Sequence, residues 1–84
     1  MKLSEDTLDT LAGVVEIDRP VGAYELARRL NRPRAWETSR QLIVLHRHEL
    51  VAQHPGPRHP VYTATEAGNL ALWDALPASM RGAA

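Results

Sequence analysis

The chain of 84 residues contains no cysteine and no phenylalanine, and its Lys+Arg and Asp+Glu each number 10. The absence of cysteine excludes disulfide frameworks, cysteine-ligated zinc and thiol nucleophiles. Without phenylalanine, the core must be built from Leu, Val, Ile and a few large rings. A chain of this length has room for one domain, which buries about 60% of the surface that its unfolded chain exposes. Two-domain enzymes with an interdomain cleft are therefore excluded.

Long hydrophobic runs are also lacking. An uninterrupted apolar run such as 42–45 is far shorter than a membrane span, and the segment 1–6 does not have the apolar region of a signal peptide. We therefore expect a soluble cytoplasmic protein with no membrane association.

Apolar residues at helical spacing predict helices over 4–18, 23–30, 33–48 and 66–76. Ser4 and Thr65 are placed to cap the first and last of these, and Asn31 to end the second. Pro33 is expected in the first turn of the third helix, and Pro20 follows the end of the first.

Between the last two helices, 50–54 and 61–64 are typical of strands, and the proline-rich segment 55–60 predicts a turn. They form a β-hairpin. Segment 20–22 is long enough only for a connector or a very short edge strand. We expect one domain over 1–77 and a flexible tail over 78–84.

The third helix has two opposed stripes. Thr38, Leu42 and Leu45 are expected to face the core. The opposite stripe is expected to face outward and consists of Trp36, Arg40, Ile43 and Arg47. Glu37, Gln41 and Val44 lie on the flank of this outward stripe. Apolar side chains and arginines that point away from the core indicate a binding surface.

The last helix is apolar on more than one side, which indicates a second buried contact. The simplest partner is another copy of the chain. The expected homodimer interface consists of Leu70, Leu72, Trp73 and Leu76.

Three segments resemble the MarR, PadR and related bacterial winged-helix regulators. Residues 25–30, ELARRL, are similar to the family's "ELA-x-x-L" second helix. Residues 38–51 resemble "V-S-R-x-L-x-x-L-x-x-x-G-L-V", with Glu49 in the place of the glycine, and 62–68, YTATEAG, resemble "Y-x-L-T-x-x-G". The resemblance implies an α+β, mainly α, winged helix-turn-helix with three helices, a two-stranded β-hairpin wing and a C-terminal helix.

The resemblance also implies sequence-specific binding of double-stranded DNA by a small transcriptional regulator that acts as a repressor. We expect no cofactor, and no small-molecule ligand is evident in the sequence. Helix 33–48 would enter the major groove, and the wing 50–64 would touch the backbone or the minor groove. Arg40 is the expected guanine reader and Gln41 an adenine reader. The full set of expected DNA-binding residues is Arg34, Trp36, Glu37, Arg40, Gln41, Arg47, Arg58 and His59.

Some of these residues have structural alternatives. Trp36 is expected to pack partly against the second helix, Ile43 against the first helix or the hairpin, and Arg40 could pair with Glu37 at the surface. The alternative function is a winged-helix protein-interaction module, with Trp36, Ile43 and the last helix as its binding face.

Metal binding and catalysis receive little support. His46 and His48 stand two apart on a helix and therefore point in opposed directions, so they do not form a chelating pair. Ser39 has no evident His/Asp partners, and no Gly-rich phosphate loop is present. We therefore expect no metal site and no enzyme.

The zero net charge conceals an uneven distribution. Residues 1–27 have a balance of −4, residues 28–59 of +5 and residues 60–84 of −1. The positive block coincides with the expected turn, recognition helix and wing, which is the distribution that a nucleic-acid partner favours.

Overall fold

The computed structural model describes residues 3–76, so the tail expected over 78–84 and the domain end at 77 lie outside the described residues. The elements follow in the order α1 (Glu5–Ile17), β1 (Val21–Gly22), α2 (Ala23–Arg29), α3 (Ala35–Arg47), β2 (Val51–His54), β3 (Val61–Ala64) and α4 (Glu66–Ala75). This is a small, mainly helical α+β fold.

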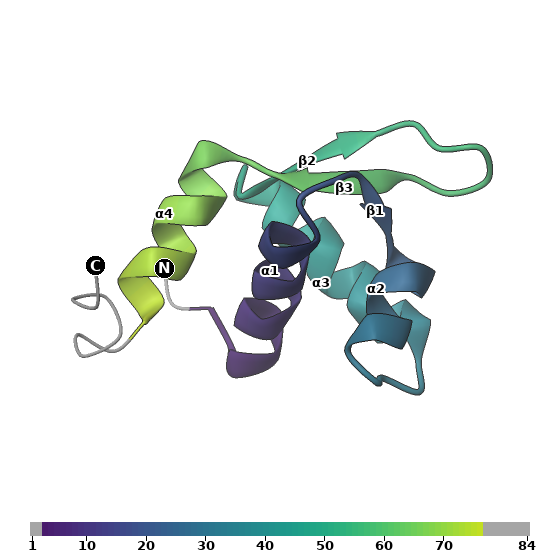
Figure 1. The fold of residues 1–84 in the computed structure, drawn as a ribbon, viewed down its shortest axis with the longest axis horizontal. Helices are drawn as coiled ribbons and strands as arrows, with labels where there is room; N and C mark the ends of the chain where they lie inside the picture. The colour runs from purple at the N-terminus through teal and green to yellow at the C-terminus, as the bar shows by residue number, and fades with distance from the viewer. Residues whose placement is uncertain (1–2, 77–84) are drawn as a thin grey trace.

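The strands form one antiparallel sheet in the order β1-β3-β2. Val21 pairs with Tyr62, and Val51 pairs with Ala64. The short segment before α2 is therefore an edge strand, which makes the sheet three-stranded, where the resemblance implied a two-stranded hairpin. In Figure 1 the sheet lies above α1, α3 and α2, and α4 stands beside α1.

The core lies between the sheet and the first three helices. Its buried members come from every element except α4: Leu11, Val14, Val21, Leu26, Leu42, Leu45, Leu50, Val51 and Tyr62. The alternation of each strand and the stripe of each helix bring these residues to one volume. No helix within residues 3–76 is long and apolar enough to cross a membrane.

The turn between α2 and α3 differs from the expectation. Asn31 adopts left-handed backbone geometry with φ 55°, and the amide of Arg32 donates to the carbonyl of Ala27 at 2.8 Å, which ends α2. Pro33 does not open α3. Arg34 has extended geometry, with φ −125° and ψ 102°, so the helix begins only at Ala35.

Thr65 joins the hairpin to both neighbouring helices. Its hydroxyl accepts from the amide of Gly68 at 3.0 Å, which confirms the expected cap, and donates to the carbonyl of Glu49 at 2.7 Å. Its own amide donates to the carbonyl of Leu50 at 3.2 Å. Gly68 is buried against that same carbonyl, so α4 can approach the end of α3 only because position 68 has no side chain.

Candidate nucleic-acid interface

The inward face of α3 fixes which of its residues reach solvent. Thr38, Leu42 and Leu45 are completely buried, which confirms the expected inward stripe. Helix α3 packs against both α1 and α2, which cover the face that carries these three residues. The opposite face therefore points outward.

That outward face forms a ridge, which we define as Trp36, Arg40, Ile43, Val44 and Arg47. All five residues are exposed: Trp36 to 54%, Ile43 to 40% and Val44 to 39%, together with both arginines. The guanidinium of Arg40 lies 5.7 Å from the centre of the Trp36 ring, within range of a cation–π interaction. Neither Arg40 nor Arg47 forms an ion pair with any residue in the range 3–76.

The expected packing of Trp36 against α2 and of Ile43 against α1 or the hairpin is only partial. Trp36 stands in the first turn of α3 and borders an open groove beside Ala23 and Tyr24 of α2. More than half of its surface nevertheless remains in contact with solvent. Ile43 lines the same groove and is likewise not a core residue.

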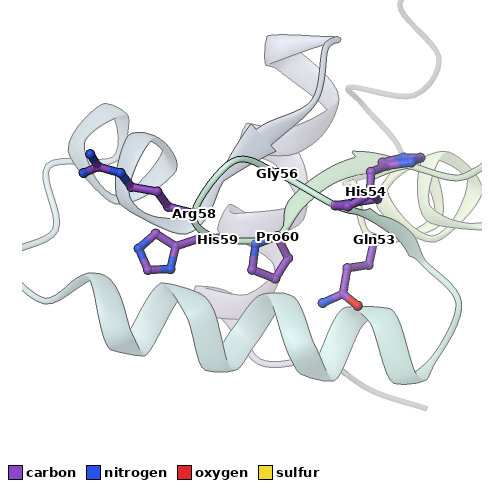
Figure 2. A pocket seen from close by; sticks show the side chains of 7 residues that line it. Gln53, His54, Gly56, Arg58, His59 and Pro60 are labelled. Atoms are coloured by element: carbon purple, nitrogen blue, oxygen red, sulfur yellow. The ribbon is translucent and has the colours of Figure 1, made fainter.

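The groove separates the ridge from the hairpin and has a volume of about 420 Å³. Its hairpin wall includes Gln53, His59 and Pro60. In Figure 2 the side chain of Gln53 extends toward the helix drawn below the hairpin, whereas Arg58 projects away from the loop. The ring of His59 lies 5.2 Å from that of Tyr24, at an interplanar angle of 47°, so the loop also contacts α2.

A polar cluster lies behind the ridge, between α1 and α3. One guanidinium nitrogen of Arg32, Nη1, donates to Thr10 Oγ1 at 2.6 Å and to Gln41 Oε1 at 2.7 Å, and it reaches Thr38 Oγ1 at 3.3 Å. The other, Nη2, donates to the carbonyl of Asp6 at 2.9 Å. The cluster therefore ties the start of α1 to the middle of α3.

This cluster changes the role open to Gln41. Its Oε1 accepts from Arg32 and also from the hydroxyl of Thr10. A bidentate contact to adenine requires both the oxygen and the amide nitrogen of a glutamine. Because the oxygen is already engaged within the fold, we do not retain Gln41 as an adenine reader.

Arg32 and Tyr24 also contribute to the site, although no motif in the sequence marked either residue. A signal for Arg32 was present, because Thr38 is a polar residue on the inward stripe of a helix, and a buried hydroxyl requires a hydrogen-bonding partner. No comparable signal marked Tyr24, which reaches the groove only through the contact between α2 and the hairpin loop.

The remaining expected site residues lie at the two ends of α3 and in the hairpin loop. Arg34 and Glu37 form a surface ion pair with an N–O distance of 3.6 Å, and their side chains are 65% and 46% exposed. Arg47 occupies the last turn of α3, and Arg58 the exposed hairpin loop. Arginines thus stand at the start, the middle and the end of α3.

The histidines have separate neighbours. His46 Nδ1 lies 3.3 Å from the carbonyl of Val51, and His54 Nε2 lies 2.8 Å from Thr63 Oγ1. Within residues 3–76, no group of three or more His, Asp or Glu side chains is arranged to hold a metal ion.

Helix α4 presents a second apolar surface. Leu70 is 57% exposed and Trp73 is 47% exposed. Leu72, in contrast, is partly buried against the core of its own chain, and it cannot belong fully to an external interface. The apolar surface open to a partner is therefore narrower than the sequence indicated, because one side of α4 faces α1 and β3.

A comparison with known protein families finds no match for this chain, and a comparison with curated proteins finds none either.

Proposed function

We propose that this protein is a small winged helix-turn-helix transcriptional regulator that binds double-stranded DNA at specific sequences. In this proposal α3 enters the major groove and the hairpin is the wing, placed on the DNA backbone or in the adjacent minor groove. The carrying observation is the ridge on α3, where Arg40 and Arg47 are exposed without a carboxylate partner among the described residues.

Arg40 is the proposed base reader. A guanidinium can donate to both O6 and N7 of guanine, and Arg40 lies at the centre of the ridge. The contact between its guanidinium and the Trp36 ring restricts the side chain before DNA arrives, which lowers the entropy that binding must remove.

The arginines at the ends of the interface are proposed phosphate contacts. Arg34 precedes the first residue of α3, Arg47 lies at the C-terminal end of the ridge, and Arg58 projects from the hairpin loop (Figure 2). Glu37 pairs with Arg34 on the surface, so in this proposal it orients Arg34 rather than reading a base. His59 lies on the groove side of the loop and is proposed to support the loop through Tyr24.

The experiment begins with selection of bound duplexes from a random library. We expect Arg40→Ala to weaken binding to the selected duplex by about 1–3 kcal/mol and to relax specificity at one base pair. Arg47→Ala should weaken all duplexes alike and reduce the slope of log K against log[salt] by about 0.9. Arg19→Ala is the matched control, because Arg19 is exposed but lies in the connector after α1 and is paired with Glu25.

If no duplex is enriched, or if Arg40→Ala and Arg47→Ala bind every duplex as the control does, the proposal is wrong. The second candidate function is then a protein-interaction module, which the exposed rings of Trp36 and Trp73 favour. That candidate predicts weak DNA binding with little sequence preference even at low salt, and a protein partner whose binding is lost in Trp36→Ala.

We further propose that the regulator is a homodimer formed through Leu70 and Trp73 of α4, with the partly buried Leu76 directly after the helix at the edge of the contact. Large apolar side chains exposed on one element are typical of such contacts. Sedimentation equilibrium at micromolar concentration should give a dimer mass that falls toward the monomer in Trp73→Ala. A monomer mass for the unmodified chain would contradict the dimer but not DNA binding.

A further inference from the structure

Apolar side chains border Arg40 on both sides along α3. Trp36 precedes it by one turn, and Ile43 and Val44 follow it by one turn. Ile43 also lines the groove toward the hairpin, whereas Val44 lines a hollow toward the start of α1. The three apolar residues therefore surround the arginine on the exposed ridge.

Phosphates and polar base edges offer no apolar surface, so contacts with them alone would leave these three side chains without a partner. The major groove offers one apolar group among its base edges, the 5-methyl group of thymine. Removing that methyl group and an aliphatic side chain from water together is favourable. The charges at both ends of α3 and in its middle match a polyanion rather than an apolar partner.

We infer that the α3 ridge reads thymine methyl groups through Ile43 and Val44, beside the base pair that Arg40 contacts. This inference rests on the proposed DNA binding and adds the chemical identity of the neighbouring base. A helix rises about 1.5 Å per residue, so Ile43 and Val44 lie about 4.5 and 6 Å beyond Arg40 along the axis. Base pairs are about 3.4 Å apart, which places the thymine about one to two pairs from the guanine.

The test uses the unmodified protein and the duplex selected above. Each thymidine is replaced in turn by deoxyuridine, which removes the methyl group and leaves every hydrogen-bonding group in place. We expect Kd to rise about three- to fivefold at one or two positions within two base pairs of the guanine, as burial of one methyl group implies. Thymidines outside the contacted segment serve as the control and should show no change.

Ile43→Ala and Val44→Ala then identify the side chain. The variant that lacks the responsible side chain should bind the thymidine and deoxyuridine duplexes equally, whereas the other should keep the full difference. The reverse experiment adds a methyl group. Cytosine is first placed at a position that responds to deoxyuridine, and its replacement by 5-methylcytosine should then restore part of the affinity.

The outcomes separate the two proposals. If a duplex is selected and no deoxyuridine replacement changes Kd, the inference is wrong and the proposed function stands. If replacement weakens binding equally in the unmodified protein and in both variants, Ile43 and Val44 are not the readers and the inference is also wrong. If no duplex is selected, both proposals fail. The replacement scan needs no variant, so it is decisive even where a substitution disturbs folding.

Discussion

Replacement of Gly68 by alanine should destabilise the protein, although alanine is the better helix former. Gly68 lies in α4 and is buried against the end of α3. A Cβ at this position would overlap the carbonyl oxygen of Leu50 and lie 3.0 Å from its carbonyl carbon. Both are backbone atoms next to a strand, so they cannot move aside as the end of a side chain could.

The overlap is relieved only if α4 shifts away from the Leu50 carbonyl. The shift breaks the hydrogen bonds from Thr65 to Leu50 and Glu49, and each of these contributes about 0.5–1.5 kcal/mol. It also removes part of the burial of Leu72, which we set at about 1 kcal/mol for a half-buried leucine. Alanine returns about 1 kcal/mol of helix propensity. The net loss should be about 1–3 kcal/mol.

Gly13→Ala is the matched control within the same core. A Cβ there would lie 2.7 Å from Leu26 Cδ1, which is the end of a flexible side chain. Rotation of that leucine relieves the contact, and the gain in helix propensity offsets its cost, so the change should stay within about 1 kcal/mol. Both variants are compared with the unmodified chain by urea unfolding monitored by circular dichroism and by thermal melting.

A loss of 2 kcal/mol in Gly68→Ala corresponds to a decrease in Tm of about 8–16 °C for a domain of this size. If Gly68→Ala unfolds at the same urea concentration as the unmodified chain, or matches Gly13→Ala, the close approach of α4 does not stabilise the fold and the reasoning is refuted.

Three further changes test other features of the fold. Glu49→Gly should raise the free energy of unfolding by about 0.5–1 kcal/mol in urea, because Glu49 has φ 61°, which a residue with a Cβ adopts at a cost; a lower urea midpoint would contradict this. Arg32→Met should lower the free energy of unfolding by about 1–3 kcal/mol, because buried hydroxyl and amide groups lose their donor. An unchanged thermal unfolding curve would show that the polar cluster contributes nothing to stability. The hydrogen bond from Arg19 lowers the pKa of Glu25. This pair therefore contributes stability above the unfolded pKa of Glu25 and loses it as the pH falls through the folded value. Arg19→Ala should return the pKa of Glu25 to its ordinary range, measured by NMR titration of its carboxyl group, and an unaltered titration would exclude the pairing in solution.

Local spacing was sufficient to predict most of the secondary structure. The inward stripe of α3, the caps at Ser4 and Thr65 and the hairpin around the proline-rich turn are all present. Each of these features depends on residues close to one another in the chain, so the local sequence is sufficient to predict it. The predicted start of α3 at Pro33 was wrong. Proline favours the first turn of a helix, but the hydrogen bonds that end α2 keep residues 31–34 outside both helices.

The candidate site was only partly predictable for the same physical reason. The outward position of Arg40 and Arg47 follows from the helix period, and the positive charge of 28–59 follows from a count. The engagement of Gln41 by Arg32, the groove between α3 and the hairpin and the contact of His59 with Tyr24 all join segments distant in the chain. A pattern in one segment contains no information on which distant side chain will complete its hydrogen bonds.

The sequence by itself determined which elements form, which helix face is apolar and where positive charge accumulates, because these depend on short-range spacing and composition. Only the tertiary structure decided which of the exposed residues remain available to a partner. Packing placed Leu72 against the core and Gln41 within a polar cluster, and it left Trp36, Arg40 and Trp73 in contact with solvent. Availability depends on what covers a side chain, and that cover comes from elements far away in the sequence.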